Sequence, residues 1–202
     1  LCVFFSVAAS ASKAQNTSAQ GSFEVTTIRD TMVPMRDGVR LATDIYLPSR
    51  DGKPLEGNYP VLLCRTPYNK ESTSTLCQRF ASHGYAVVIQ DTRGRYKSEG
   101  IWHMMTDDGR DGFDAASWIV AQPWCNGRIG TQGGSAGGIT QNLLAGAIPA
   151  GLACQHINVA AASLYQHAAY VGGALRKSQI EGWLTGHQFD PEALTLYRAH
   201  PV

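Results

Sequence analysis

The sequence lacks an excess of charge of either sign. Its 202 residues include 17 Lys and Arg against 16 Asp and Glu, which gives a formal net charge of +1. Binding to nucleic acid or to an anionic membrane surface depends on clustered positive charge, so the composition supports neither partner. General disorder is excluded too, because 44% of the residues are hydrophobic and only 16% are charged.

Metal-ligand and nucleotide-binding motifs are missing as well. No C-x-x-C pair or zinc-type cysteine and histidine spacing occurs among Cys2, Cys64, Cys77, Cys125 and Cys154. The glycine-rich turn near residue 133 has neither a G-x-G-x-x-G run nor a P-loop lysine. We therefore expect no metal site and no cofactor. In an exported protein the last four cysteines can form one or two disulfides, and their pairing stays open.

The N-terminal apolar run is too short to span a membrane. Leu1–Ala9 is about half of the roughly 20 residues that a span needs. It ends in the small-x-small pattern Ala9-Ser10-Ala11, which is typical of a secretory signal peptide, although the basic residues that should precede it are missing. The alternative is an N-terminus with chance apolar content. We expect a signal-peptide remnant and spacer over residues 1–20, and hence a secreted or periplasmic protein without a membrane anchor.

The rest of the chain predicts a hairpin followed by alternating strands and helices. Residues 22–35 and 40–47 are rich in β-formers and flank a D-G turn, and residues 48–59 have the composition of a loop. Apolar runs predict strands at 61–64, 85–90, 128–132 and 156–160. Helical patterns occur at 72–83, 106–122, 137–147 and 178–199. This alternation indicates an α/β fold, with a mainly parallel sheet covered by helices and an antiparallel N-terminal hairpin.

The clearest chemical signal is the G-x-S-x-G pattern at residues 133–137. Such a pattern often arises by chance in a glycine-rich chain, but here it stands between a predicted strand and a predicted helix. That context is typical of a nucleophile elbow, in which Ser135 is lifted above the carboxyl edge of the sheet. Gly133 and Gly137 leave room for the tight turn, and the amide of Ala136 points to where an oxyanion would form. The alternative is a nucleotide-binding turn, whose other motif residues are missing.

Further motifs make the pattern specific. R-T-P-Y stands at 65–68, Q-D-T-R-G-R at 90–95 with S-E-G at 98–100, and W-C-N-G-R-I-G at 124–130 leads into the serine turn. The M-R-D-G-V-R-L hairpin at 35–41 is a further motif of the same set. Over about residues 24–185 the chain resembles the Xaa-Pro dipeptidyl-peptidase and cocaine-esterase-like family of α/β-hydrolases, which also includes α-amino-acid ester hydrolases and glutaryl-cephalosporin acylases.

The resemblance implies an α/β-hydrolase fold with helices on both faces of the sheet, and a serine acyl hydrolase that needs no cofactor. Ser135 would attack a small ester or amide, or a short peptide, and form an acyl-enzyme that water releases. The hydroxyl of Tyr68 would join the Ala136 amide in stabilising the oxyanion. The alternative for Tyr68 is a packed tyrosine bonded to the backbone. We expect Asp91 and Arg93 to hold the loop after their strand rather than to take part in the chemistry.

Two departures from the family pattern narrow what the resemblance implies. The residue after the nucleophile is usually large, whereas Ala136 is small and would leave the neighbouring pocket more open. The amino-acid ester branch binds an ammonium group with carboxylates, but residues 164–175 contain no Asp or Glu. The cocaine-esterase-like branch therefore fits better, and the choice between esterase and peptidase stays open, as does the oligomeric state.

No convincing triad acid and histidine follow the serine. The family order is Ser, then Asp or Glu, then His. After Ser135 the carboxylates and histidines are Glu181, Asp190, Glu192, His156, His167, His187 and His200. The pair of Asp190 and His200 would lie in a helical cap, which we expect to begin over residues 166–202, after an N-terminal half of the hydrolase domain at 21–165.

We therefore expect the triad Asp and His beyond Val202, an incomplete hydrolase fold, and no activity from these residues alone. The alternative is a catalytically inactive truncated or pseudo-hydrolase chain that binds acyl compounds or another subunit.

Overall fold

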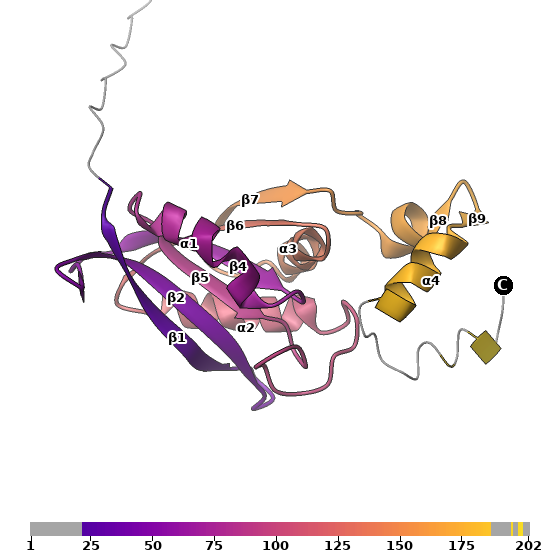
Figure 1. Cartoon of the computed structure of the whole chain (residues 1–202), viewed down its shortest axis with the longest axis horizontal. Coiled ribbons are helices and arrows are strands. Elements are labelled where there is room, and N and C mark those ends of the chain that lie inside the picture. The colour runs from indigo at the N-terminus through magenta and orange to yellow at the C-terminus, as the bar shows by residue number, and fades with distance from the viewer. Residues whose placement is uncertain (1–21, 187–194, 196–197, 200–202) are drawn as a thin grey trace, which may run out of the picture.

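The computed structural model describes residues 22–186, 195 and 198–199. A mixed sheet forms its centre, in the strand order β1-β2-β5-β4-β6-β7 (Figure 1). The pairings of β1 with β2 and of β2 with β5 are antiparallel, whereas β5, β4, β6 and β7 are parallel neighbours. The strands are β1 (Glu24–Pro34), β2 (Arg40–Arg50), β4 (Tyr59–Thr66), β5 (Ala86–Asp91), β6 (Cys125–Gly134) and β7 (Leu152–Asn158). The expected parallel sheet with an antiparallel hairpin at its edge is confirmed.

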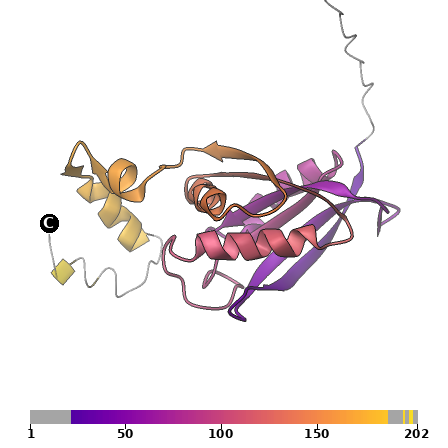
Figure 2. The same ribbon diagram turned by 180° about the vertical axis from the view of Figure 1, so that it is seen from behind.

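Helices cover both faces of the sheet, as Figures 1 and 2 show from opposite sides. A 3₁₀ helix, η1 (Lys70–Thr73), leads into α1 (Ser74–Ala81) on one face, and α2 (Asp108–Val120) and α3 (Ala136–Ala147) cover the other. The continuous apolar run of β5 explains this arrangement, because its alternate side chains enter different cores. Val87 and Ile89 pack with α1, while Ala86 and Val88 belong to the cluster that includes α2 and α3. A strand buried on both faces needs apolar residues at every position.

After β7 the chain leaves the sheet. A short π-helix, η2 (Leu164–Ala169), a small hairpin and a helix lie to one side of the sheet in Figure 1. The hairpin strands are β8 (Tyr170–Val171) and β9 (Ala174–Leu175), and the helix is α4 (Lys177–Gly186). The helix expected from residue 178 is thus present to residue 186, and its assignment to a helical cap stays a prediction. The signal remnant at 1–20 lies outside the described residues, and the domain boundary near residue 165 stays a prediction.

Two expected boundaries are wrong. Residues 48–59 are not all loop, because β2 continues to Arg50 and pairs there with a short strand, β3 (Lys53–Pro54). Pro48 is tolerated because the pairing of β2 with β5 has already ended at Tyr46. The last parallel strand covers 152–158 rather than 156–160. This strand, β7, pairs with β6, but most of its side chains are exposed. A hydrophobic pattern in the sequence therefore does not reveal its bounds.

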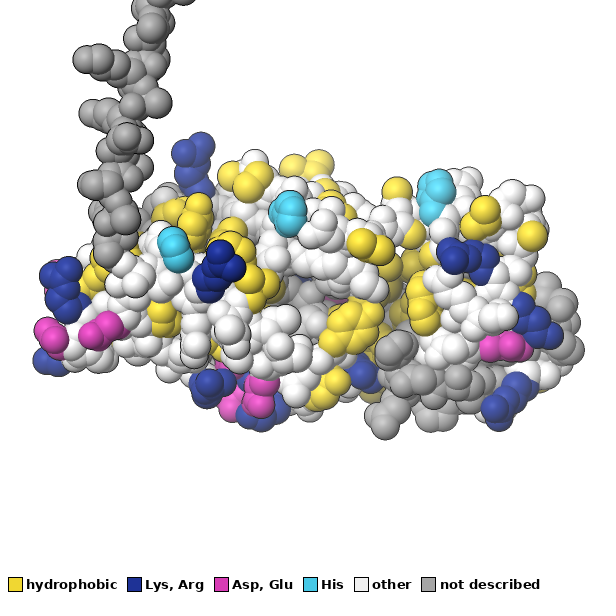
Figure 3. Space-filling model, turned by 45° about the horizontal axis from the view of Figure 1, so that its top comes forward, with side chains coloured by type: hydrophobic (Ala, Val, Ile, Leu, Met, Phe, Trp, Pro, Cys, Tyr) yellow, Lys and Arg dark blue, Asp and Glu magenta, His cyan; other side chains and the backbone are white. Residues whose placement is uncertain are grey.

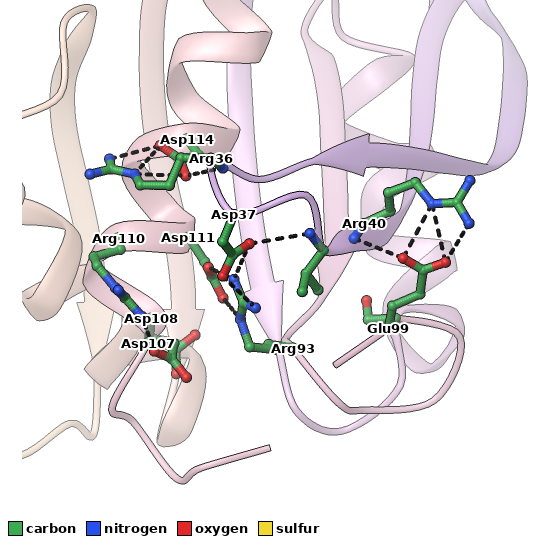
Figure 4. A network of polar contacts seen from close by, with 12 residues as sticks. Arg36, Asp37, Arg40, Arg93, Glu99, Asp107, Asp108, Arg110, Asp111 and Asp114 are labelled. Carbon is green, nitrogen blue, oxygen red and sulfur yellow. Dashed lines mark hydrogen bonds and ion pairs between the residues drawn. The ribbon is translucent and has the colours of Figure 1, made fainter. Parts of the chain in front are cut away.

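An ion-pair network ties the loop after β5 to the rest of the molecule (Figure 4). The guanidinium of Arg93 donates from Nε to Asp111 on α2 at 3.0 Å, and its NH1 lies 2.9 Å from Asp37 in the hairpin turn. The hydrogen bond from Arg93 lowers the pKa of Asp37. These contacts agree with the expected structural role of Arg93.

The surface and the thiols give further observations. On the face drawn in Figure 3, basic side chains are dispersed and several stand beside acidic ones. Within the described part of the chain, no helix is long and apolar enough to cross a membrane, and no cluster of His, Cys, Asp or Glu is suited to a metal ion. The four cysteines in that part, Cys64, Cys77, Cys125 and Cys154, are free thiols.

Candidate active site

The carboxyl ends of β4, β5 and β6 meet at one edge of the sheet, because these strands are parallel neighbours. Ser135 follows directly after β6, and Tyr68 comes two residues after the end of β4. The hydroxyl oxygen of Tyr68 lies 3.4 Å from the Oγ atom of Ser135. The structure thus brings together two residues that are 67 positions apart in the chain and that the sequence singled out for the same reaction.

The backbone of Ser135 is held in a strained conformation. Its φ of 54° and ψ of −123° place a non-glycine residue in the left-handed half of conformational space. Hydrogen bonds on both sides impose this shape: the amide donates to the carbonyl of Asn158 at 3.0 Å, and the carbonyl accepts from Gly138 and Ile139. The serine side chain is exposed at the start of α3. Strain held by its surroundings in this way is typical of a nucleophile elbow.

The glycines of the turn are needed for close approach. A Cβ atom on Gly133 would lie 2.8 Å from the carbonyl oxygen of Gly137, and one on Gly138 would lie 2.6 Å from the Cβ of Ala160. Sequence reasoning did not single out Gly138, although it is visible in the sequence as the last glycine of G-x-S-x-G-G. Gly137 is less constrained, since its nearest neighbour would be the carbonyl oxygen of Arg65 at 3.3 Å.

We expect Gly133→Ala to lower the free energy of unfolding by about 1–3 kcal/mol, because backbone atoms must move to admit the methyl group. Gly134→Ala is the matched control, since its new Cβ would meet its nearest neighbour, the carbonyl oxygen of Asn158, at an ordinary 3.5 Å. Urea unfolding of both variants measures the difference. Equal unfolding midpoints for the two would contradict the requirement for glycine at position 133.

Tyr68 is held by the segment that follows β4. Its amide donates to the Oγ1 atom of Thr66 at 3.0 Å, and the next residue, Asn69, has a left-handed φ of 79°. The Tyr68 side chain is 41% exposed, so its hydroxyl can be reached from solvent. Ala136 is the first residue of α3, and N–H groups in the first turn of a helix have no acceptor within the helix. Both predicted oxyanion donors therefore lie beside Ser135.

An apolar pocket adjoins these residues. Besides Tyr68, Ser135 and Ala136, its lining includes the apolar Trp102, Met105 and Ile139 and the charged Arg95. A second cavity of about 290 Å³ lies next to it and shares Met104 and Trp183 with the pocket. Sequence reasoning missed Trp102 and Met105, because the loop at 101–107 has no hydrophobic period that would reveal which side chains turn inward.

No triad partner stands at Ser135 within the described residues. None of the histidines in this part of the chain lines the pocket, and Glu181 lies on α4 without lining it. The other candidates, His187, Asp190, Glu192 and His200, fall outside the described residues. The site as described therefore brings together Ser135, the predicted nucleophile, with Tyr68 and Ala136, the predicted oxyanion donors.

The comparisons with known proteins agree with this geometry. Residues 37–197 match the family described as X-Pro dipeptidyl-peptidase (S15 family). The chain belongs to this family. The S15 chain is also 45% identical over 161 residues to a cocaine esterase from Rhodococcus sp. (strain MB1 Bresler). The match covers 76% of the chain but only 27% of the length of that esterase.

Solved structures resemble the S15 chain over most of its length. An α-amino acid ester hydrolase matches 88% of the chain, with a TM-score of 0.65 and 26% identity, over 33% of its own length. A CocE/NonD family hydrolase from Staphylococcus aureus matches 87%, with a TM-score of 0.69 and 24% identity, over 36% of its length. These likenesses confirm the α/β-hydrolase fold. The chain spans about a third of each of these structures.

Proposed function

We propose that the chain carries the nucleophile and the oxyanion donors of a serine hydrolase that cleaves esters or amides through an acyl-enzyme. The observation that carries the proposal is the 3.4 Å separation of the Tyr68 hydroxyl and the Ser135 Oγ at the carboxyl edge of the sheet. A nucleophile next to a preorganised donor is the arrangement that acyl transfer needs.

The reaction would run in two steps. The Oγ atom of Ser135 bonds to the carbonyl carbon and loses its proton to a base, while the Tyr68 hydroxyl and the Ala136 amide stabilise the oxyanion. The leaving group departs with a proton, and water then releases the acyl group from Ser135. No histidine of the described residues lines this pocket, so the proposal requires a base from outside this part of the chain.

The apolar lining favours a substrate with an apolar group next to the scissile bond. Trp102, Met105 and Ile139 are apolar, and the charged lining residue, Arg95, stacks on Trp102 and donates to the carbonyl of Pro67. The small side chain of Ala136 leaves the space beside the serine open. We infer an esterase or amidase for small molecules, with X-Pro peptides as the other substrate class that the family name suggests. Export is part of the proposal and rests on the Leu1–Ala11 pattern.

Labelling with a fluorophosphonate tests the proposal. The full-length protein, including any sequence beyond Val202, should be modified on the peptide that contains Ser135, and heat-denatured protein should not. Residues 1–202 expressed alone should label negligibly, because no histidine of the described residues lines the pocket to activate the serine. Rates on p-nitrophenyl esters and X-Pro anilides then separate esterase from peptidase. Absence of both labelling and hydrolysis in the folded full-length protein would favour the inactive, binding alternative.

A further inference from the structure

Lys70 is a buried charged residue that the proposed reaction does not use. It follows Tyr68 by two positions and is only 1% exposed. Burying an ammonium group is unfavourable unless it is paired, and Lys70 is paired twice. Its Nζ atom lies 2.8 Å from Asp44 on β2, which is itself fully buried, and 2.7 Å from Asp30 on β1. Burial lowers the pKa of Lys70, but the hydrogen bonds to Asp30 and Asp44 outweigh it and the net shift is upward.

The backbone of Lys70 is fixed as firmly as its side chain. Its amide donates to the Oδ1 atom of Asp91, the last residue of β5, at 2.7 Å. Burial raises the pKa of Asp91, and the hydrogen bond from the Lys70 amide opposes that shift. Position 70 is thereby joined through its backbone to the end of β5 and through its side chain to β1 and β2.

The carboxylates that hold Lys70 depend on an irregularity in the hairpin. The register of β1 against β2 shifts between Ile28 and Thr31, and within this bulge Asp30 has a left-handed φ of 54°. The amide of Asp30 donates to Asp44 at 2.9 Å, which sets the two carboxylates on either side of the ammonium group. Bulges that redirect a side chain are frequent beside active sites.

These contacts fix Tyr68 from both directions. Before Tyr68, the Thr66 hydroxyl accepts a hydrogen bond from the Tyr68 amide. After Tyr68, the strained Asn69 leads directly into Lys70, which is held by Asp91. A left-handed non-glycine residue persists where its surroundings hold it in place. Without the anchor at Lys70, the segment could relax and carry the Tyr68 hydroxyl away from Ser135.

We propose that Lys70 is a positioning residue: its buried ammonium group, paired with Asp44 and Asp30, holds the Tyr68 hydroxyl at the oxyanion site. Lys70 touches no reacting atom and acts only through Tyr68. This proposal rests on the proposed function and adds to it a residue whose charge holds Tyr68 in position.

The test uses the full-length protein and a p-nitrophenyl ester. We expect Lys70→Met to lower kcat about 10- to 100-fold and to change KM less than about twofold, because the oxyanion exists only in the transition state. Lys97→Met is the matched control. Lys97 also pairs with Asp30, at 2.8 Å, but its side chain is 53% exposed and distant in sequence from Tyr68. We expect its kcat to stay within about twofold of the wild-type value.

A double-mutant cycle separates positioning from a general structural role. In a Tyr68→Phe background, Lys70→Met should lower kcat less than about twofold further, because the hydroxyl that it positions is gone. If the Lys70 variant does not fold, Asp44→Asn weakens the same anchor with an isosteric side chain and enters the cycle instead. If Lys70→Met lowered kcat by the same factor in both backgrounds, the proposal would be overturned. An unchanged kcat for the single variant would overturn it as well. If Tyr68→Phe alone has no effect, the oxyanion role of Tyr68 and the positioning role both fall.

Discussion

Replacing Ser135 with alanine is expected to lower kcat of the full-length protein about a million-fold, which is the usual loss when a serine hydrolase loses its nucleophile. Alanine removes the Oγ atom that is proposed to form the acyl-enzyme and leaves the proposed oxyanion donors in place. The methyl group fits where the serine side chain now stands exposed, so the fold should not change. Steady-state hydrolysis of a p-nitrophenyl ester measures the loss, and circular dichroism checks the fold.

Ser82→Ala is the control for this substitution. Ser82 follows α1 and bonds to the carbonyl of Arg79, near the amino end of β5 and therefore at the opposite edge of the parallel strands. Its removal should leave kcat unchanged. Oxyanion donors and substrate binding alone leave only a small residual rate. If the Ser135→Ala protein kept more than about one part in a thousand of the wild-type rate, the nucleophile would therefore be another residue.

The sequence predicts the architecture well where local pattern and burial agree. β5 is a run of apolar residues buried on both faces, and its existence and place in a parallel sheet are evident from that run. Ser135 is found because its motif stands between a strand and a helix. β7 is placed less accurately, because most of its side chains are exposed in the described structure and the strand is defined by hydrogen bonds to β6, not by its own hydrophobicity.

Tertiary contacts define the parts of the site that the sequence does not reveal. Lys70 and Asp44 have side chains that are usually exposed, so no local pattern indicates that both are buried and paired. Their pairing requires the β1 bulge, the β2 register and the end of β5 to meet, and these come from separate parts of the chain. Tyr68 itself was found through family resemblance, since a lone tyrosine after a strand carries no chemical signature.

Tyr68→Phe is expected to lower kcat about 100- to 1,000-fold, which is the typical loss on removing one oxyanion donor. Phenylalanine keeps the ring and its packing and removes only the hydroxyl that lies 3.4 Å from Ser135 Oγ. The donor acts on charge that develops in the transition state, so KM should change little. Steady-state kinetics with the same ester gives both constants.

Tyr96→Phe is the matched control for Tyr68→Phe, because it also removes a single tyrosine hydroxyl. Tyr96 lies in the loop after β5, is 56% exposed, and contacts the guanidinium of Arg95 through its ring. Its kcat should match that of the wild type, because this substitution keeps the ring and the hydroxyl has no part in the proposed site. A Tyr68→Phe protein with a raised KM and unchanged kcat would show that Tyr68 only packs against the substrate, and the Ala136 amide would then be the one oxyanion donor left among the residues proposed for that role.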